Sequence, residues 1–312
     1  TYEAKIYAGT EWDKRWWKKL NELNAKNLFY KASFTDNYDQ YIANLSSHRV
    51  LGFFDYGWQA ANATNLLNDA ARADPSLDGY RYFPLPIVFD ENIKDQYLDP
   101  IGYVANRGMG ITVNAKDPER IIAFIDHMLK EEVQLLLKWG VEGETYLRDS
   151  NGRLYRTQEM IDKMDQKFQE DYGLTVFDWD WPHWGSNSTF SDGNAVSPGY
   201  QPEVFQASLT DADKKFLSAY GVQTYAELFS DPDPRPWFPA WGIPRDSERE
   251  LFESLKADVQ REFLPKLVLS KPEEFDSVWD QYIAALNRLD VAGYENWYTQ
   301  KIQAIMAKAQ GK

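Results

Sequence analysis

The sequence contains no cysteine and only three histidines among its 312 residues. The absence of cysteine excludes disulfides, thiol nucleophiles and cysteine-ligated metals. No stretch approaches the ~20 consecutive apolar residues that a membrane-spanning helix needs. HExxH, phosphate-binding, dinucleotide-binding and Ser-His-Asp motifs are missing as well. These absences point away from the common metal-dependent, nucleotide-dependent and triad enzymes.

The net charge is −14, and neither lysine nor arginine gathers into a long basic run. Such a chain repels polyanions, so we expect no nucleic-acid or anionic-membrane partner. The length suits one large or two modest domains. The 12 Trp, 19 Tyr and 17 Phe are more large rings than a core of this size requires. We therefore expect some Trp and Tyr rings to lie near the surface and to face a ligand.

The stretch from Tyr103 to Tyr155 is typical of an α/β unit. The β-branched Ile111–Val113 predicts a short strand, and Asp117 can cap a helix with proline in its first turn. Gly140 ends the helical pattern, and the run 149–152 predicts a hairpin turn. Capping boxes and periodicity predict other helices after Thr10, Thr35, Thr157, Thr210, Thr224, Ser247 and Ser270, over Gln59–Arg72 and over Glu295–Ala309, and strands over Glu3–Tyr7 and His48–Phe54.

Asp55, Tyr56 and Trp58 follow directly after the predicted strand at His48–Phe54. In an open α/β sheet, the loop after a strand opens onto the crevice where ligands bind. We therefore predict that Asp55, Tyr56 and Trp58 contact a ligand. The alternative is that Trp58 packs in the core against the following helix.

A second group of rings lies in a loop rich in Pro, Gly, Ser and Asn. Because this loop has no regular element to pack, some of its rings are expected to face solvent. Indole faces suit the C–H faces of a sugar, and neighbouring polar groups suit its hydroxyls. The predicted ligand-binding residues of this loop are Trp179, Asp180, Trp181, His183 and Trp184. The alternatives are that some of these Trp fill the core and that the carboxylates only solvate the loop.

Two proline-rich stretches interrupt the regular pattern. Residues 80–88 alternate aromatics with prolines, which predicts a crossing segment rather than a central strand. A second proline and aromatic run contains Trp237 and Trp241, which we also predict to bind ligand. Arg107 is a further candidate because a guanidinium could hold a uronate carboxylate.

Several of these segments, in this order, resemble the large extracellular solute-binding proteins of ABC importers. Residues 116–119 match a "K-x-P-E" helix start, and Trp139–Tyr146 matches "yG-x-x-G-x-x-Y" before a Gly-containing hairpin. Residues 263–276 resemble that family's closing junction, with Ser270 where glycine is common. The layout is most similar to the long oligosaccharide-binding lipoproteins, including alginate-binding proteins.

The resemblance implies an α/β, periplasmic-binding-protein-like (type II) two-lobe fold. It implies that residues 1–85 lie in the second lobe, that 86–147 cross the hinge into the first lobe, and that 148–312 return as a mostly helical segment. Those relatives are longer at the N-terminus, so we expect the chain to be a C-terminal portion without the first lobe's opening strands. Any calcium site would lie in that absent part, and no other cofactor is expected.

The function implied is capture of an oligosaccharide between two lobes and its delivery to a membrane permease. The expected protein is a monomer and not an enzyme, and it is extracellular, either lipid-anchored or periplasmic. A glycoside hydrolase or a stand-alone carbohydrate-binding module would also use Trp platforms, and these alternatives stay open. The 48 Asp and Glu residues could always supply a catalytic carboxylate pair, so their presence decides nothing.

Overall fold

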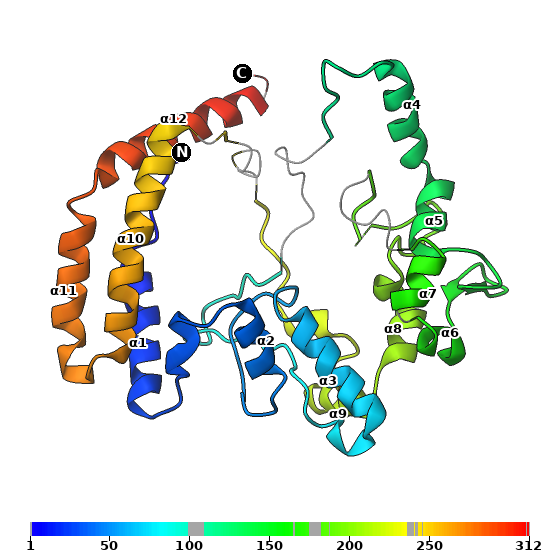
Figure 1. The fold of residues 1–312 in the computed structure, drawn as a ribbon, viewed down its shortest axis with the longest axis horizontal. Coiled ribbons are helices and arrows are strands. Elements are labelled where there is room, and N and C mark those ends of the chain that lie inside the picture. The colour runs from blue at the N-terminus through cyan, green and yellow to red at the C-terminus, as the bar shows by residue number, and fades with distance from the viewer. Residues whose placement is uncertain are drawn as a thin grey trace. The chain divides into compact units, whose positions relative to one another are not determined.

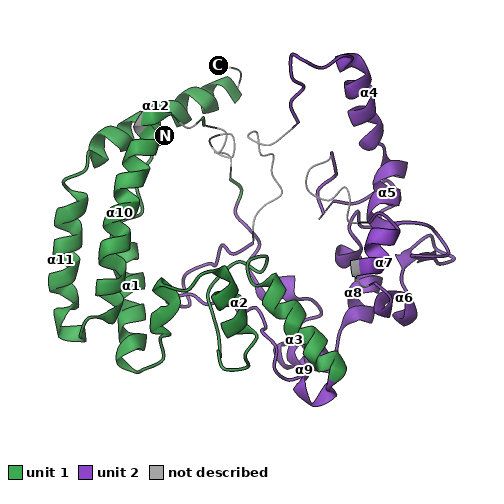
Figure 2. Ribbon diagram, viewed as in Figure 1, with its two compact units in different colours: residues 1–73, 102–106, 234–312 green, residues 74–101, 107–233 purple. Residues whose placement is uncertain are grey.

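The computed structural model describes residues 2–98, 109–164, 166–174, 182–186, 188–235, 240, 243–244, 246–309 and 311. Figure 2 shows the chain as two compact units. Unit 1 contains residues 1–73, 102–106 and 234–312, and unit 2 contains residues 74–101 and 107–233. The predicted division into 1–85, 86–147 and 148–312 concerns crossings between two lobes and stays a prediction.

Unit 1 is built from helices. They are α1 (Glu11–Ala25), α2 (Tyr38–Leu45), α3 (Ala61–Ala73), α10 (Ser247–Leu269), α11 (Phe275–Leu286) and α12 (Val291–Ala309), with 3₁₀ turns at Lys31–Phe34 and Pro272–Glu274. Figure 1 shows α1, α10 and α11 side by side. As predicted, the Thr10 hydroxyl caps α1 by accepting a hydrogen bond from the Asp13 N–H. The start predicted at Thr35 is wrong, because Asn37 and Gln40 form the capping box that begins α2.

The core of unit 1 lies between α10 and α11. Leu267 of α10 and Phe275 and Tyr282 of α11 are at most 1% exposed. Trp279 meets Tyr282 edge to face, with ring centroids 5.4 Å apart. Ala8, just before α1, belongs to the same cluster. Segments from both ends of the chain therefore share one core.

Asn21 of α1 is buried at the carboxyl end of α10. Its side-chain Nδ2 donates to the carbonyl oxygens of Leu267 at 2.9 Å, Val268 at 3.2 Å and Ser270 at 2.8 Å. The last carbonyls of a helix have no partner within the helix. Asn21 therefore supplies hydrogen bonds that α10 cannot supply for itself.

We expect Asn21→Ala to lower the free energy of unfolding of unit 1 by about 2 kcal/mol. The Val268 and Ser270 carbonyls lose the Asn21 donor, whereas the Leu267 carbonyl still accepts from the Ser270 hydroxyl. Urea denaturation followed by circular dichroism measures this change. Lys19→Ala is the control, since Lys19 lies on the same helix in an exposed ion pair with Glu22. Equal stability of the two variants would show that water satisfies the α10 carbonyls.

Unit 2 combines short helices with one small sheet. Its elements are α4 (Pro118–Met128), α5 (Glu131–Trp139), β1 (Leu147–Arg148), β2 (Leu154–Tyr155), α6 (Gln158–Asp162), α7 (Gln166–Asp171), α8 (Pro202–Ser208), α9 (Asp211–Tyr220) and 3₁₀ turns at Pro75–Leu77, Pro198–Tyr200 and Tyr225–Leu228. The caps predicted in unit 2 at Asp117, Thr157 and Thr210 are confirmed: Asp117 accepts from the Arg120 N–H, Thr157 from the Met160 N–H, and Thr210 forms a capping box with Asp213. In unit 1 the caps predicted at Ser247 and Ser270 are wrong, because Asp246 caps the start of α10 and Ser270 lies at its end. Gly140 ends α5 with φ of 90°, a conformation that favours glycine.

The hairpin of unit 2 forms where the sequence predicts it. β1 and β2 are antiparallel, with Leu147 opposite Tyr155. The Asp149 carboxylate holds the turn by accepting from the backbone N–H groups of Asn151 and Arg153, each at 2.8 Å. Leu154 points into the core of this unit and is fully buried. The hairpin therefore contributes directly to the core of unit 2.

Three predicted strands are wrong. Glu3–Tyr7 is extended, but its Ala4 and Ile6 N–H groups donate to side chains of α12 rather than to a strand. Residues 48–54 and Ile111–Val113 form no strand, and the side chains of Leu51 and Val113 are almost fully exposed. A strand needs a neighbouring strand for its backbone groups. Among the described residues, β1 and β2 are the only strands, and they pair with each other.

Arg153, between β1 and β2, forms a bidentate ion pair with Glu203 of α8. Nε lies 2.8 Å from Oε1 and Nη2 lies 3.1 Å from Oε2. The Arg153 side chain holds the pKa of the Glu203 carboxyl below its ordinary value of 4.5. A depressed pKa means that the pair stabilises the folded state only while Glu203 is ionised.

We expect this contribution, about 0.5 kcal/mol for a partly exposed pair, to be present above about pH 4.5 and lost as the pH falls through the folded pKa. The measurement is the free energy of unfolding against pH for wild type and Glu203→Gln. The two curves should differ near neutral pH and converge in acid. Glu132→Gln, on an exposed position of α5, is the control. Parallel curves at all pH values would contradict the assignment.

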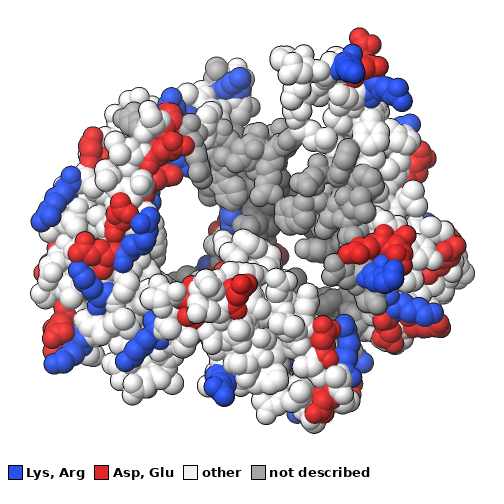
Figure 3. Space-filling model, viewed as in Figure 1, with Lys and Arg blue, Asp and Glu red and all other residues white. Residues whose placement is uncertain are grey.

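Acidic and basic side chains are interspersed over both units on the face that Figure 3 shows. Several of these side chains form ion pairs one turn apart on the same helix, as Arg249 does with Glu253 and Lys266 with Glu262 in α10. Within the ranges that the structure describes, no helix combines the length and apolarity needed to cross a bilayer.

Candidate ligand-binding site

Residues 54–58, which we call the aromatic loop, lie in unit 1 between α2 and α3. Asp55 fixes the backbone of this loop because its Oδ1 accepts from the Tyr56 N–H at 2.7 Å. The Tyr41 hydroxyl of α2 donates to the other carboxylate oxygen of Asp55 at 3.0 Å. The ring of Phe54 lies 4.9 Å from that of Trp16 in α1, centroid to centroid. The loop is thus tied to two helices of its own unit.

Tyr56 and Trp58 form an exposed pair of rings. Their centroids are 6.2 Å apart and their planes differ by 22°, so the rings are nearly parallel. Tyr56 is 65% exposed and Trp58 is 69% exposed. The predicted alternative, a core Trp58 packed under α3, is therefore wrong. Two large apolar faces stand in water on a loop whose backbone is hydrogen-bonded.

The neighbouring polar groups are supplied by α2, the aromatic loop and α3. The Tyr38 hydroxyl, on a half-exposed ring, donates to the Gln59 carbonyl and accepts from Asn62 Nδ2, both at 3.2 Å. The exposed Asp55 carboxylate can accept further hydrogen bonds. Flat rings beside hydroxyl, amide and carboxylate groups can stack on the C–H face of a sugar and bind its hydroxyls.

Trp184 of unit 2 is partly used for packing. Its indole Nε1 donates to the Leu129 carbonyl at 2.9 Å, and its backbone N–H donates to Gln134 Oε1 at 2.7 Å. Its ring lies 5.9 Å from that of Phe190, at the edge of the unit 2 core. His183 is exposed, and its Nδ1 lies 3.0 Å from the Trp184 carbonyl oxygen. Ligand binding by His183 and Trp184 stays a prediction.

The structure brings Asp55, Tyr56 and Trp58 together in unit 1 and His183 and Trp184 together in unit 2. The other predicted ligand-binding residues lie outside the described residues; they are Arg107, Trp179, Asp180, Trp181, Trp237 and Trp241.

Sequence reasoning missed the contributions of Tyr38 and Tyr41. Both lie on the apolar face of the helix predicted after Thr35, and such a face usually packs against a neighbouring element. Tyrosine rather than phenylalanine at both positions is the signal, because a Tyr hydroxyl needs a polar partner. Here those partners are groups next to Trp58 and within the aromatic loop.

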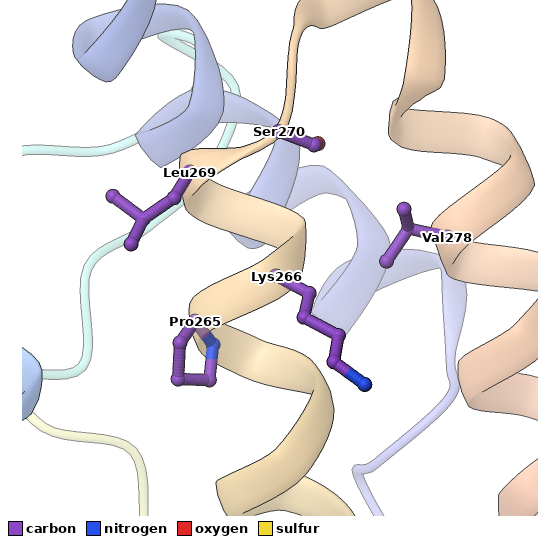
Figure 4. A pocket seen from close by; sticks show the side chains of 5 residues that line it. All are labelled: Pro265, Lys266, Leu269, Ser270 and Val278. Carbon is purple, nitrogen blue, oxygen red and sulfur yellow. The ribbon is translucent and has the colours of Figure 1, made fainter.

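Two surface hollows of unit 1 lie outside the predicted residues. One, of about 440 Å³, is lined by Pro265, Lys266, Leu269 and Ser270 at the end of α10 and by Val278 of α11 (Figure 4). Its lining is largely apolar, and no predicted ligand-binding residue reaches it. The other, of about 460 Å³, lies between α1 and α11.

Comparison with known proteins bears on the N-terminal part of the chain. No curated protein and no solved structure matches the chain. The family that does match implies a periplasmic-binding-protein-like fold, with which the described helices and small sheet are compatible. Residues 3–135, which contain the whole aromatic loop, match the family model of bacterial extracellular solute-binding proteins.

Proposed function

We propose that the protein is the substrate-binding component of an ABC importer and that its ligand is an oligosaccharide. The family match over residues 3–135 supports the solute-binding role. The oligosaccharide is inferred from the chemistry of the aromatic loop, which lies inside the matched segment.

The observation that carries the proposal is the exposed, nearly parallel pair of Tyr56 and Trp58. Exposed large apolar groups on an ordered loop forgo the free energy that burial would give them. A bound sugar ring would recover part of it, because stacking contributes roughly 0.5–1.5 kcal/mol per aromatic contact beyond area burial. Asp55 would accept hydrogen bonds from sugar hydroxyls and so orient the ring.

In this mechanism the aromatic loop captures the glycan, and closure of two lobes surrounds it with further rings and polar groups. Trp179, Asp180, Trp181, His183, Trp184, Arg107, Trp237 and Trp241 are the proposed further contacts. The closed form then docks on the permease subunits. We further propose that the protein acts as a monomer on the outer side of the membrane, lipid-anchored or periplasmic, without a cofactor.

The test is incubation of the protein with labelled oligosaccharides, followed by binding measurements and by chromatography of the sugar. The importer component should bind saturably and return the oligosaccharide uncut. Shortened products would instead favour a glycoside hydrolase. Binding that persists when the two units are separated would favour a stand-alone carbohydrate-binding module.

A further inference from the structure

The hollow between α1 and α11 combines an exposed ring with several positive charges. Its lining residues are Glu11, Trp12, Lys14, Arg15 and Lys18 of α1 and Asp276 of α11. It is an open surface hollow of about 460 Å³, so a ligand there would stay partly in contact with solvent. None of these residues belongs to the aromatic loop, so the hollow is separate from the site proposed above.

Two ammonium groups in this hollow share one carboxylate. Lys14 Nζ lies 2.9 Å from one oxygen of Asp276, and Lys18 Nζ lies 4.0 Å from the other. The two lysines lower the pKa of the Asp276 carboxyl, so it is ionised at neutral pH. Because one negative charge faces two positive charges, the lysine pair keeps an excess of one positive charge.

The side chains of α11 also position these ammonium groups. Lys14 Nζ lies over the Trp279 ring and Lys18 Nζ over the Phe275 ring, each 5.8 Å from the ring centroid. A cation over a ring face is attracted by the ring quadrupole. Phe275 and Trp279 belong to the core of unit 1, so the rings that hold both lysines are themselves fixed.

Trp12 supplies an apolar wall to the hollow, and it is 63% exposed. An indole face beside fixed cations suits a ligand whose ring has an apolar face and carries an anionic substituent. The ring would stack on Trp12 while the substituent lies between the ammonium groups of Lys14 and Lys18.

We propose that this hollow is a second ligand site, which binds a small organic anion consisting of a ring with a carboxylate. Asp276 is then a competitor, because it occupies the ammonium groups that the ligand carboxylate needs. The two kinds of substitution should therefore change the affinity in opposite directions. Removing the Asp276 carboxylate should strengthen binding of the anion, whereas removing either lysine should weaken it.

The probe is glucuronate, titrated into protein labelled with 5-fluorotryptophan at constant ionic strength. The fluorine resonance of Trp12 is assigned by its loss in Trp12→Phe. Wild type should show a saturable shift of this resonance with glucuronate, and a much smaller response to glucose. Asp276→Asn should lower the Kd by about threefold, and Lys18→Gln should raise it by a similar factor.

Asp258→Asn is the matched control, because Asp258 is an exposed partner of Arg261 elsewhere in unit 1. It should leave the Kd unchanged, which separates the local effect of Asp276 from a change in net charge. Benzoate tests whether an aromatic acid binds as a sugar acid does, and saturation by either supports the site. An unresponsive Trp12 resonance with both acids, or equal effects of the two Asp→Asn variants, would overturn the proposal.

Discussion

Replacing Trp58 with alanine is expected to raise the Kd for a neutral oligosaccharide about tenfold, which corresponds to about 1.4 kcal/mol. The variant removes one face of the Tyr56–Trp58 pair, on which a sugar ring would stack. The melting temperature should hardly change, because the Trp58 side chain is 69% exposed and little core packing is lost. Isothermal titration calorimetry and differential scanning calorimetry measure the two quantities on the same samples.

Tyr7→Ala is the matched control for this experiment. Tyr7 carries a similarly exposed ring of unit 1, at 59%, but it lies outside both the aromatic loop and the hollow between α1 and α11. It should leave the affinity for a neutral oligosaccharide unchanged. Equal affinity of wild type and Trp58→Ala, or a large loss of stability in Trp58→Ala, would contradict the role of the aromatic loop.

Trp139→Ala is expected to destabilise unit 2 by about 3–5 kcal/mol, the largest effect on stability that we predict. The Trp139 ring is fully buried and meets Tyr146 edge to face, with centroids 5.6 Å apart. Its Nε1 donates to the Ala195 carbonyl at 3.0 Å, and the Arg156 guanidinium lies 5.5 Å over the ring. The substitution thus leaves a cavity and a buried carbonyl without its donor.

Hydrogen exchange followed by mass spectrometry measures this effect unit by unit. Peptides from α5 and the hairpin should lose protection, while those from α1, α10 and α11 keep theirs, because the two units have separate cores. Leu136→Ala on the same helix is the control, since Leu136 is 55% exposed. Equal loss of protection in both units would contradict their independent stability.

Several of the helix caps could be predicted because they are local. Thr10, Asp117 and Thr210 each bond to a backbone N–H three residues later, and the short sequence around them contains the whole pattern. The hairpin turn at Asp149 is local for the same reason. Residues 48–54 and 111–113 have strand composition, yet strand formation depends on a distant partner that composition does not reveal.

The candidate site was predictable only in part. Trp58 was predicted to contact a ligand because it follows the strand expected at residues 48–54. That strand does not form, so the exposed ring agrees with the prediction but not with the reason given for it. The supporting hydrogen bonds of Tyr38 and Tyr41 join different segments, so no spacing rule could indicate them. Trp184 was also predicted to contact ligand, but its indole N–H donates to the Leu129 carbonyl and part of its ring packs against the core of unit 2.

The central claim is most directly tested by calorimetry on the intact protein with the oligosaccharides that a glycan array selects, followed by chromatography of the recovered sugar. The account predicts saturable binding of an uncut oligosaccharide that weakens in Trp58→Ala. It would be contradicted if no glycan bound, or if binding were as tight without the Trp58 ring.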